Sequence, residues 1–314
     1  MKWGTTAAGL VLFFAMLACA ISGDNYLIRM ATTFAMYSTL ALSWNLIGGF
    51  TGYPSFATAA FFGLGAYASG VMELHGFSLL SGVVVAGFVA GFFALALGAL
   101  VLHLRGHYFA IATLVVADVV REFANNAESL TGGGMGLNVP LRHGSPHSQA
   151  LFYLLAMSLC AIVAIFAAKG VFKSRLGFGL RCIAQNEAAA ASIGVNARAY
   201  KTAAFALSGV FPALAGAVYA SWVTYIDPTD VFDVLLTIKP IVMVLIGGSS
   251  IWFGPIVGAF VFIVLEEFVW RHLLNFHTGS LGILIALLIV FLPGGLRSLI
   301  HPHNVFQRLR RARP

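Results

Sequence analysis

An otherwise apolar chain is interrupted at residues 169–201 by the stretch K-G-V-F-K-S-R-L-G-F-G-L-R-C-I-A-Q-N-E-A-A-A-A-S-I-G-V-N-A-R-A-Y-K. This stretch holds six of the 18 Lys and Arg residues of the chain and one acidic residue, Glu187. Apolar segments long enough to cross a membrane lie on both sides of it. The stretch therefore divides the predicted spans into two groups. Because Lys and Arg collect in cytoplasmic loops, it also predicts the orientation of the chain in the membrane.

A short helix with readable ends is predicted inside this loop. Asn186 is a good N-cap, because its side-chain oxygen can accept from the free N–H groups of the first turn. Glu187 then lies at the positive helix end, and Ala188–Ala191 is a strong helix-forming run. Gly194 suits the left-handed residue that ends a helix, and Asn196 can cap the next one. The helix is about 10 Å long at 1.5 Å per residue. Two interpretations stay open: a docking element for a partner, or an ordinary surface helix.

The composition predicts an all-α polytopic membrane protein. Of the 314 residues, 60% are hydrophobic and 9% are charged, whereas a soluble domain carries about 25% charged residues. The apolar runs far exceed the roughly ten residues of a barrel strand, which favours helices. The net charge of +7 does not indicate nucleic-acid binding, because the basic residues lie in loops. Cys19, Cys160 and Cys182 show neither a metal spacing nor a disulfide framework.

About ten transmembrane helices are expected, some of them Gly-rich and discontinuous. They cover residues 5–22, 27–47, 53–72, 78–102, 107–124, 150–168, 202–223, 234–247, 253–274 and 279–297. Most approach the roughly 20 residues needed to cross, but the eighth is short enough for a half-helix. The first apolar run is interpreted as a span rather than as a signal peptide.

The distribution of charge predicts that both termini are cytoplasmic. With the N-terminus inside, six crossings place 169–201 inside, and four more do the same for the basic tail, 298–314. Of the 11 acidic residues, Glu187 is then the one that falls in an inside loop. The whole of 1–314 is expected to be a single membrane domain.

The stretch from Gly48 to Gly70 predicts a broken helix. Gly48, Gly49, Gly52 and Pro54 make an uninterrupted helix unfavourable, and broken backbone at membrane depth is tolerated where it lines a cavity. One interpretation is a translocation pathway near Thr51, Tyr53 and Ser55. The alternative is tight packing, since small residues are frequent where membrane helices touch.

Charged residues inside the predicted spans are few. Asp118, Arg121 and Glu122 share one helix face and can pair with one another. Lys239, followed by Pro240, lies deeper, where it can mark a helix break or reach toward water. The three-residue face is interpreted as structural pairing near the membrane surface.

Motifs that would supply energy or chemistry are absent from the sequence. No Gly-Lys dipeptide occurs, so there is no phosphate-binding G-x-x-x-x-G-K-[ST] loop. No H-E-x-x-H, G-x-S-x-G or C-x-x-C pattern occurs either. His143 and His147 are four residues apart, but Pro146 disfavours the helix that would align them for a metal. The sequence therefore predicts neither an enzyme nor an ATPase site in this chain.

Motifs along nearly the whole chain resemble one family. They are Asn45-Leu46, Gly52-Tyr53, Ser55-Phe56, Phe62-Gly63, Gly65–Tyr67, Arg105-Gly106, Tyr108–Ala110, Thr113-Leu114, Leu130–Gly133, Leu176–Arg181, Asn186–Ala189, Gly194–Asn196, Tyr200-Lys201, Ala204-Phe205, Leu207-Ser208, Met243-Val244, Gly247-Gly248, Gly254-Pro255 and Gly258-Ala259. In this combination the chain resembles the permease subunits of branched-chain amino acid ABC importers, in their LivM-like branch.

The resemblance implies roles for two sets of residues. Residues 169–201 become a cytoplasmic coupling loop, whose short helix sits in a cleft of an ATPase. The residues expected to couple to the ATPase are Arg181, Asn186, Glu187, Ala188, Ala189, Gly194 and Asn196. The residues expected to line the translocation pathway are Gly49, Thr51, Gly52, Tyr53, Ser55, Tyr108, Gly247 and Gly248.

The resemblance also implies partners and a location. These are a second permease subunit of the LivH-like type, two cytoplasmic ATP-binding subunits, a periplasmic substrate-binding protein and the lipid of a bacterial cytoplasmic membrane. No cofactor is expected on this chain, and ATP is used by the partner subunits. The expected cargo is a branched-chain amino acid, with urea, amides or aromatic acids as alternatives. A secondary transporter, a channel and a membrane enzyme using His107, Asp118 or Glu122 are the other classes considered.

Overall fold

The structure is a computed structural model, and it describes residues 13–14, 17–18, 24–104, 106–142, 144–249, 251–272 and 282. Most of the predicted first and last spans, and the basic tail 298–314, lie outside the described residues. The remaining predicted spans form one bundle.

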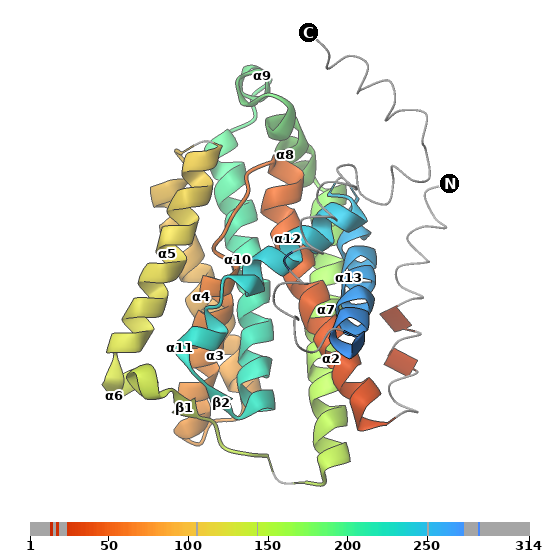
Figure 1. Cartoon of the computed structure of the whole chain (residues 1–314). Helices are drawn as coiled ribbons and strands as arrows, with labels where there is room; N and C mark the ends of the chain where they lie inside the picture. Colours follow the sequence, from red (N-terminus) through yellow and green to blue (C-terminus); the bar gives the residue numbers. More distant parts are fainter. Residues whose placement is uncertain are drawn as a thin grey trace.

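The described residues form an almost entirely helical bundle (Figure 1). Its α-helices are α2 (Asn25–Trp44), α3 (Thr58–Leu74), α4 (Leu79–Val101), α5 (His107–Asn126), α6 (Glu128–Thr131), α7 (Pro146–Lys173), α8 (Arg175–Gln185), α9 (Glu187–Ser192), α10 (Ala197–Val223), α11 (Pro228–Val231), α12 (Leu235–Gly247) and α13 (Gly254–His272). A π-helical turn, η1 (Asn45–Gly49), extends α2, and a 3-10 turn, η2 (Gly133–Met135), follows α6.

Two polar connections, residues 169–201 and the chain between α5 and α7, lie at opposite ends of the bundle (Figure 1). One end carries α8 and α9, and we call it the α9 end. The other end carries α6 and a small antiparallel sheet of β1 (Leu137–Asn138) and β2 (Tyr225–Ile226), in which Leu137 pairs with Ile226. We call this the sheet end. The predicted spans, counted from an N-terminus inside, likewise put residues 125–149 and 169–201 on different sides of the membrane.

Small residues allow the helices to approach closely. On α4, residues spaced by four face α3 and α10 and are buried, namely Gly82, Ala86, Ala90, Ala94 and Gly98. The opposite face of α4 exposes Leu80, Phe88 and Phe92 by 74–77% of their surface, as a lipid-facing side does. Because lipid tails are as apolar as Leu, close packing of small residues rather than hydrophobic contrast holds such helices together.

The helices α3 and α10 make a close contact of this kind. A Cβ atom added at Gly65 would lie 2.1 Å from the carbonyl oxygen of Ala213. One added at Gly216 would lie 2.0 Å from the carbonyl oxygen of Phe62. Glycine is therefore required at both positions, and these contacts fix α3 beside the long helix α10.

Three described helices, α4, α7 and α10, are long and apolar enough to cross a membrane on their own composition. The other predicted spans that are described depart from that pattern for local reasons. The helices α3 and α12 are short, with 17 and 13 residues. The outer half of α5 carries the charged residues Asp118, Arg121 and Glu122. The all-helical membrane architecture is confirmed, and the count of ten spans stays a prediction.

The predicted break in the Gly-rich stretch is confirmed, and its position is sharper than the sequence indicated. The chain leaves η1, adopts φ of +74° at Gly52, and is non-helical over residues 52–57. The helix α3 therefore begins at Thr58 and not near residue 53 as predicted. Figure 1 shows this segment running from the α9 end into the bundle before α3 starts.

The boundaries around the polar loop also differ from the prediction. The helix α7 starts at Pro146 and continues to Lys173, and α10 starts at Ala197. These helices extend past the apolar runs because charged residues are tolerated once a helix leaves the membrane. The loop 169–201 is consequently mostly helical.

Candidate functional site: the loop helix and the broken span

The capping predicted for the loop helix α9 is confirmed. The Oδ1 atom of Asn186 accepts hydrogen bonds from the backbone N–H groups of Ala188 at 3.0 Å and Ala189 at 3.1 Å. Gly194 has φ of +85°, in the left-handed region. Asn196 caps α10 by accepting from the N–H of Ala199 at 3.1 Å. Both ends of the six-residue helix are therefore fixed by residues in its own loop.

The side chain of Glu187 faces the chain's own bundle. Its Oε1 atom lies 2.9 Å from Nζ of Lys201 in the first turns of α10. Its Oε2 atom accepts a hydrogen bond of 2.6 Å from the hydroxyl of Tyr53 in the non-helical segment. The two stretches singled out from the sequence, 169–201 and 48–70, thus meet at one carboxylate.

Lys201 completes this network from the buried side. Its side chain is 3% exposed, against 21% for Glu187. The Nζ atom lies 4.5 Å from the centre of the Tyr53 ring and 3.4 Å from its hydroxyl. A buried ammonium requires a paired anion, since an unpaired one is strongly destabilising. Glu187 therefore neutralises Lys201, and we call Tyr53, Glu187 and Lys201 the Glu187 network.

The face of α9 that points away from the bundle is uncharged. Ala188, Ala189 and Ser192 are exposed, and Ile193, directly after the helix, is 66% exposed. Sequence reasoning had missed Ile193. Its position in a polar loop could have indicated a role, because an exposed apolar residue there is a candidate contact for a partner.

Arg181, another predicted coupling residue, packs within the loop. Its Nη1 atom donates to the carbonyl oxygen of Phe172 at 3.1 Å, and its guanidinium lies 4.5 Å from the centre of the Phe172 ring. The Phe172 ring in turn contacts Phe50 at 5.9 Å between centroids. Arg181 therefore fixes the corner between α7 and α8 against the end of η1.

Two buried threonines hold the non-helical segment in place. The N–H of Phe56 donates to Oγ1 of Thr113 on α5 at 2.9 Å. The N–H of Ala59 donates to Oγ1 of Thr237 on α12 at 3.0 Å, and the Thr237 hydroxyl donates back to the carbonyl oxygen of Phe56 at 3.4 Å. Thr113 is the seventh residue of α5, so this contact lies about 9 Å along the helix. The break between η1 and α3 is thus satisfied by side chains of two other helices, as broken membrane helices require.

Four predicted pathway residues lie in or beside the non-helical segment. The hydroxyl of Thr51 donates to the carbonyl oxygen of Ile47 at 2.5 Å, and Ser55 accepts from the N–H of Ala57 at 3.3 Å. Gly52 provides the left-handed turn, and Tyr53 enters the Glu187 network. Thr51, Gly52, Tyr53 and Ser55 thus lie in one short segment, which Tyr53 links to the loop helix.

The other predicted pathway residues have separate surroundings. A Cβ atom at Gly49 would lie 1.7 Å from Oδ1 of Asn45, and one at Gly247 would lie 1.8 Å from the carbonyl oxygen of Gly254. Both glycines therefore have a packing role. Gly248 ends α12 with φ of +95°, and Tyr108 is 75% exposed near the start of α5.

A cavity of about 300 Å³ adjoins the pinned end of the non-helical segment. Its apolar lining consists of Phe56, Ala59, Leu114, Ala117, Phe232 and Val234, and its polar lining of Asp118, Arg121, Thr229, Asp233 and Thr237. We call it the α5 cavity. The predicted pairing on α5 is confirmed, because Arg121 lies 3.5 Å from Asp118 and 3.8 Å from Glu122.

The short connection from β2 to α12 is acidic, and one of its residues, Asp233, lines this cavity. Asp227 caps α11; burial opposes ionisation, but hydrogen bonds from Thr229 and from the N–H groups of Asp230 and Thr229 lower the pKa of the Asp227 carboxyl. Burial, together with the nearby Asp227 and Asp233, raises the pKa of the Asp230 carboxyl. Three carboxyl groups are thus concentrated within seven residues.

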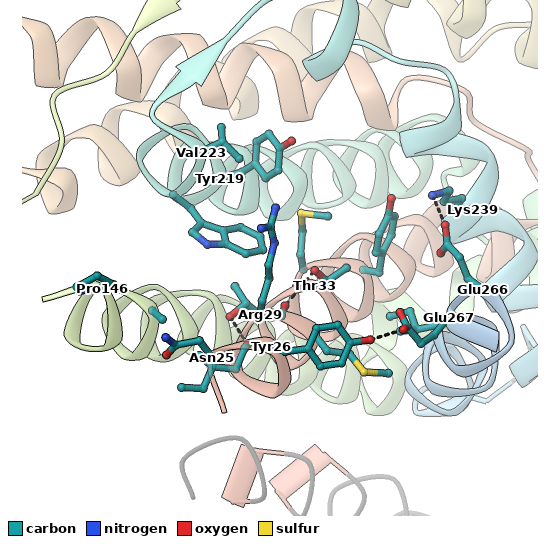
Figure 2. Close-up of a pocket in the computed structure, with 18 residues that line it drawn as sticks. Asn25, Tyr26, Arg29, Thr33, Pro146, Tyr219, Val223, Lys239, Glu266 and Glu267 are labelled. Carbon is teal, nitrogen blue, oxygen red and sulfur yellow. Dashed lines mark hydrogen bonds and ion pairs between the residues drawn. The ribbon is translucent and has the colours of Figure 1, made fainter. Parts of the chain in front are cut away.

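A larger cavity of about 990 Å³ lies beside the first half of α2, and Figure 2 shows the side chains that line it. Lys239 on α12 is paired with Glu266 on α13 at 2.7 Å, and each side chain is 15% exposed. The hydroxyl of Tyr26 donates to Glu267. The deep lysine noted in the sequence is therefore paired, and the pair joins α12 to α13 beside Pro240, which cannot donate a backbone hydrogen bond.

Comparisons with known proteins agree with this architecture. Residues 26–292 match the family model described as "Branched-chain amino acid transport system / permease component". The high-affinity branched-chain amino acid transport system permease protein LivM of Escherichia coli K12 is 25% identical over 95% of this chain and 77% of its own length. LivM of Salmonella typhimurium is similar to the same extent.

A shorter similarity links the chain to another permease. The nucleoside ABC transporter permease protein NupC of Lactococcus lactis is 40% identical over 86 residues, which are 26% of this chain and 27% of that protein. No solved structure matches. Among the described residues, no group of three or more His, Cys, Asp or Glu side chains could hold a metal ion.

Proposed function

Since the chain belongs to the branched-chain amino acid transport system permease family, we propose that it is one membrane subunit of an ATP-driven importer of branched-chain or similar amino acids. Its partners are a second permease subunit of the LivH-like type, two cytoplasmic ATP-binding subunits and a periplasmic binding protein. The ATP-binding subunits use the ATP, and this chain binds no cofactor. The chain lies in a bacterial cytoplasmic membrane with both termini inside.

The Glu187 network is the observation that carries this proposal. It joins the loop helix α9 to the non-helical segment through the hydrogen bond from Tyr53 to Glu187. The other end of that segment is held by Thr113 and Thr237 inside the bundle. A displacement of α9 by an ATPase would therefore be transmitted to backbone at membrane depth.

We assign two different roles within α9. Glu187 and the buried Ala190 face the bundle and hold the helix in place. Ala188, Ala189, Ser192 and Ile193 present a small, uncharged, exposed surface that suits a cleft of the ATPase. In this arrangement Asn186, Gly194 and Asn196 shape the helix ends, and Arg181 steadies the corner behind it. ATP binding does work only if the ATPases bind nucleotide differently in the two states of the permease.

Reconstitution tests the assignment. The chain is co-expressed with the candidate second permease and ATPase subunits, purified, and inserted into liposomes that contain ATP. We expect uptake of L-leucine that requires both ATP and the binding protein. Uptake by this chain alone, driven by an ion gradient, would instead identify a secondary transporter. The ligand of the binding protein must then be identified to define the cargo. This step is needed because part of the chain is also similar to a nucleoside permease.

Two cysteine variants test the orientation. Ser192→Cys lies on α9, and Met135→Cys lies at the sheet end, where Met135 is 84% exposed. We expect a membrane-impermeant maleimide added to intact spheroplasts to label Met135→Cys and to spare Ser192→Cys. The opposite pattern would exclude contact between α9 and cytoplasmic ATPases.

A further inference from the structure

One face of α5 carries exposed charged side chains. The side chains of Asp118, Arg121 and Glu122 are 59%, 40% and 58% exposed. Asp118 lies eight residues before the end of α5 at Asn126, about 12 Å inside it at 1.5 Å per residue. Intramembrane charges that are not buried in protein face a water-filled path or a partner subunit. Asp118 and Arg121 also line the α5 cavity, so this part of α5 faces that cavity.

The α5 cavity opens among these charges at the meeting point of two interrupted segments. Phe56 comes from the break before α3, and Ala59 from the first turn of that helix. Asp233 and Val234 come from the connection between α11 and α12, and Thr237 from the first turn of α12. In other transporters, sites near the bilayer midplane are built where helices are discontinuous. Its volume of about 300 Å³ is at the lower end of small-molecule pockets, which run from about 300 to 1,000 Å³.

The lining of the α5 cavity fits a small zwitterion with an apolar side chain. Arg121 has distances of 3.5 and 3.8 Å to its acidic neighbours, longer than the roughly 2.7–2.9 Å of a tight charge-assisted bond. Its fork of five N–H donors can therefore turn to a carboxylate. Asp118 and Asp233 offer oxygens to an ammonium group, and Leu114, Ala117, Phe232 and Val234 offer an apolar wall.

The larger cavity fits such a ligand less well. Its two acids are already engaged, Glu266 by Lys239 at 2.7 Å and Glu267 by the hydroxyl of Tyr26. Binding an ammonium there would require breaking a tight, mostly buried pair. Arg29, which also lines it, provides a matched control for Arg121.

We propose that the α5 cavity is this chain's part of the amino-acid binding site on the transport path. Arg121 binds the α-carboxylate, Asp118 and Asp233 bind the α-ammonium group, and the apolar wall takes the side chain. This inference rests on the proposed function as an amino-acid permease, and it adds the class of ligand and the groups that select it. Because Phe56 lines the cavity three residues after Tyr53, about 10 Å of extended chain links the site to the Glu187 network.

Transport by matched arginine variants tests the site. Arg121→Gln, Arg121→Lys and Arg29→Gln are compared with the unmodified complex in liposomes at saturating binding protein. We expect Arg121→Gln to lower L-leucine moved per ATP hydrolysed at least tenfold, Arg121→Lys to recover part of it, and Arg29→Gln to lie within twofold of the unmodified complex. Equal ratios for Arg121→Gln and the unmodified complex would overturn the assignment.

Thiol protection tests the ligand independently of turnover. Leu114→Cys lies in the cavity wall, and the adjacent Val115→Cys, 53% exposed, lies outside it. We expect millimolar L-leucine to slow maleimide labelling of Leu114→Cys in the assembled complex several-fold. We expect 3-methylbutylamine and 4-methylpentanoate, which each lack one charged group, to have no effect, and Val115→Cys to be unaffected throughout.

The outcomes separate the two proposals. Absence of ATP-driven L-leucine uptake by the unmodified complex would overturn the proposed function, and this inference with it. Normal uptake, with either no protection of Leu114→Cys by L-leucine or no loss in Arg121→Gln, would overturn this inference alone. Protection by 3-methylbutylamine or by 4-methylpentanoate alone would show that binding does not require both charged groups of an amino acid. That result would also overturn this inference.

Discussion

The hydroxyl of Tyr53 donates a 2.6 Å hydrogen bond to Oε2 of Glu187, across 134 positions of sequence. This contact joins a residue of a broken membrane span to a helix in the largest polar loop. The same carboxylate neutralises Lys201, which is almost fully buried. One side chain thus has a structural task, the pairing of a buried ammonium, and a mechanical one, the attachment of α9 to the segment that precedes α3.

The ion pair between Glu187 and Lys201 predicts that removal of the Glu187 charge destabilises the fold. Glu187→Gln leaves the Lys201 ammonium buried with a neutral partner, and we expect a loss of up to about 3 kcal/mol in stability, below the 3–5 kcal/mol typical of fully buried pairs because Glu187 is partly exposed. Thermal unfolding of the purified complex measures it. The exchanged double variant Glu187→Lys, Lys201→Glu should recover part of the loss. Unchanged unfolding in Glu187→Gln would mean that the pair contributes nothing.

Capping of α9 predicts a local effect. Asn186→Ala removes the acceptor for two N–H groups, which costs about 1 kcal/mol for a typical N-cap. We expect hydrogen exchange at Ala188 and Ala189 to accelerate roughly fivefold, since about 1 kcal/mol corresponds to that factor. Asn196→Ala, which uncaps the long helix α10, is the matched control, and exchange within α9 should not change in it.

Close packing predicts that Gly247 acts through structure. Gly247→Ala would place a Cβ atom 1.8 Å from the carbonyl oxygen of Gly254, so we expect destabilisation of about 1–3 kcal/mol, typical of overpacking. Gly170→Ala in α7 has no neighbour within 4 Å and should be neutral or slightly stabilising. If Gly247→Ala unfolded like the wild type and yet changed transport, the residue would belong to the pathway as first predicted.

The acidic connection between β2 and α12 predicts that removal of one of its charges stabilises the fold in a pH-dependent way. The raised pKa of Asp230 means that its charged form is disfavoured in the folded state, by burial and then by Asp227 and Asp233. The stability that this group contributes is present below its unfolded pKa of about 3.9 and is lost as pH rises through the higher folded value. We expect Asp230→Asn to unfold at a higher temperature than wild type at pH 7, and the gain to vanish below about pH 4. A gain that persists at low pH would point to a different cause.

The lowered pKa of Asp227 predicts the opposite dependence of stability on pH. Its contribution is present above the unfolded pKa and is lost as pH falls through the lower folded value. We expect Asp227→Asn to unfold at a lower temperature than wild type at pH 7, because the amide is a weaker acceptor for the N–H groups of Thr229 and Asp230. Comparison of the two variants at one pH controls for general effects of losing an acid.

Local structure could be predicted from the sequence where one residue type has one physical use. Asn186, Gly194 and Asn196 occupy the capping positions expected of them, and Gly52 and Pro54 mark the break that the structure contains. The face shared by Asp118, Arg121 and Glu122 also follows from helical spacing alone.

Contacts between distant segments could not be predicted in the same way. Nothing in the spacing of Tyr53, Glu187 and Lys201 indicates that they meet, because a side-chain contact across the bundle depends on how α10 packs on α3. The threonines that pin Phe56 and Ala59 look like ordinary small residues of membrane helices until their partners are known. The close approach of Gly254 to Gly247 is equally hidden from the sequence, and the pathway role of Gly247 stays a prediction.

The transfer of motion from α9 to the broken span is the central claim, and removal of one hydroxyl tests it most directly. Tyr53→Phe deletes the bond to Glu187 and keeps the ring, whereas Tyr67→Phe deletes a buried hydroxyl that has no partner among the described residues. The measurement is L-leucine transported per ATP hydrolysed by the reconstituted complex. We predict a fall of about tenfold in Tyr53→Phe with ATP hydrolysis retained, as expected for a bond to a charged group worth at least about 1.5 kcal/mol, and no fall in Tyr67→Phe. Equal ratios in the two variants, with the complex intact, would contradict the account.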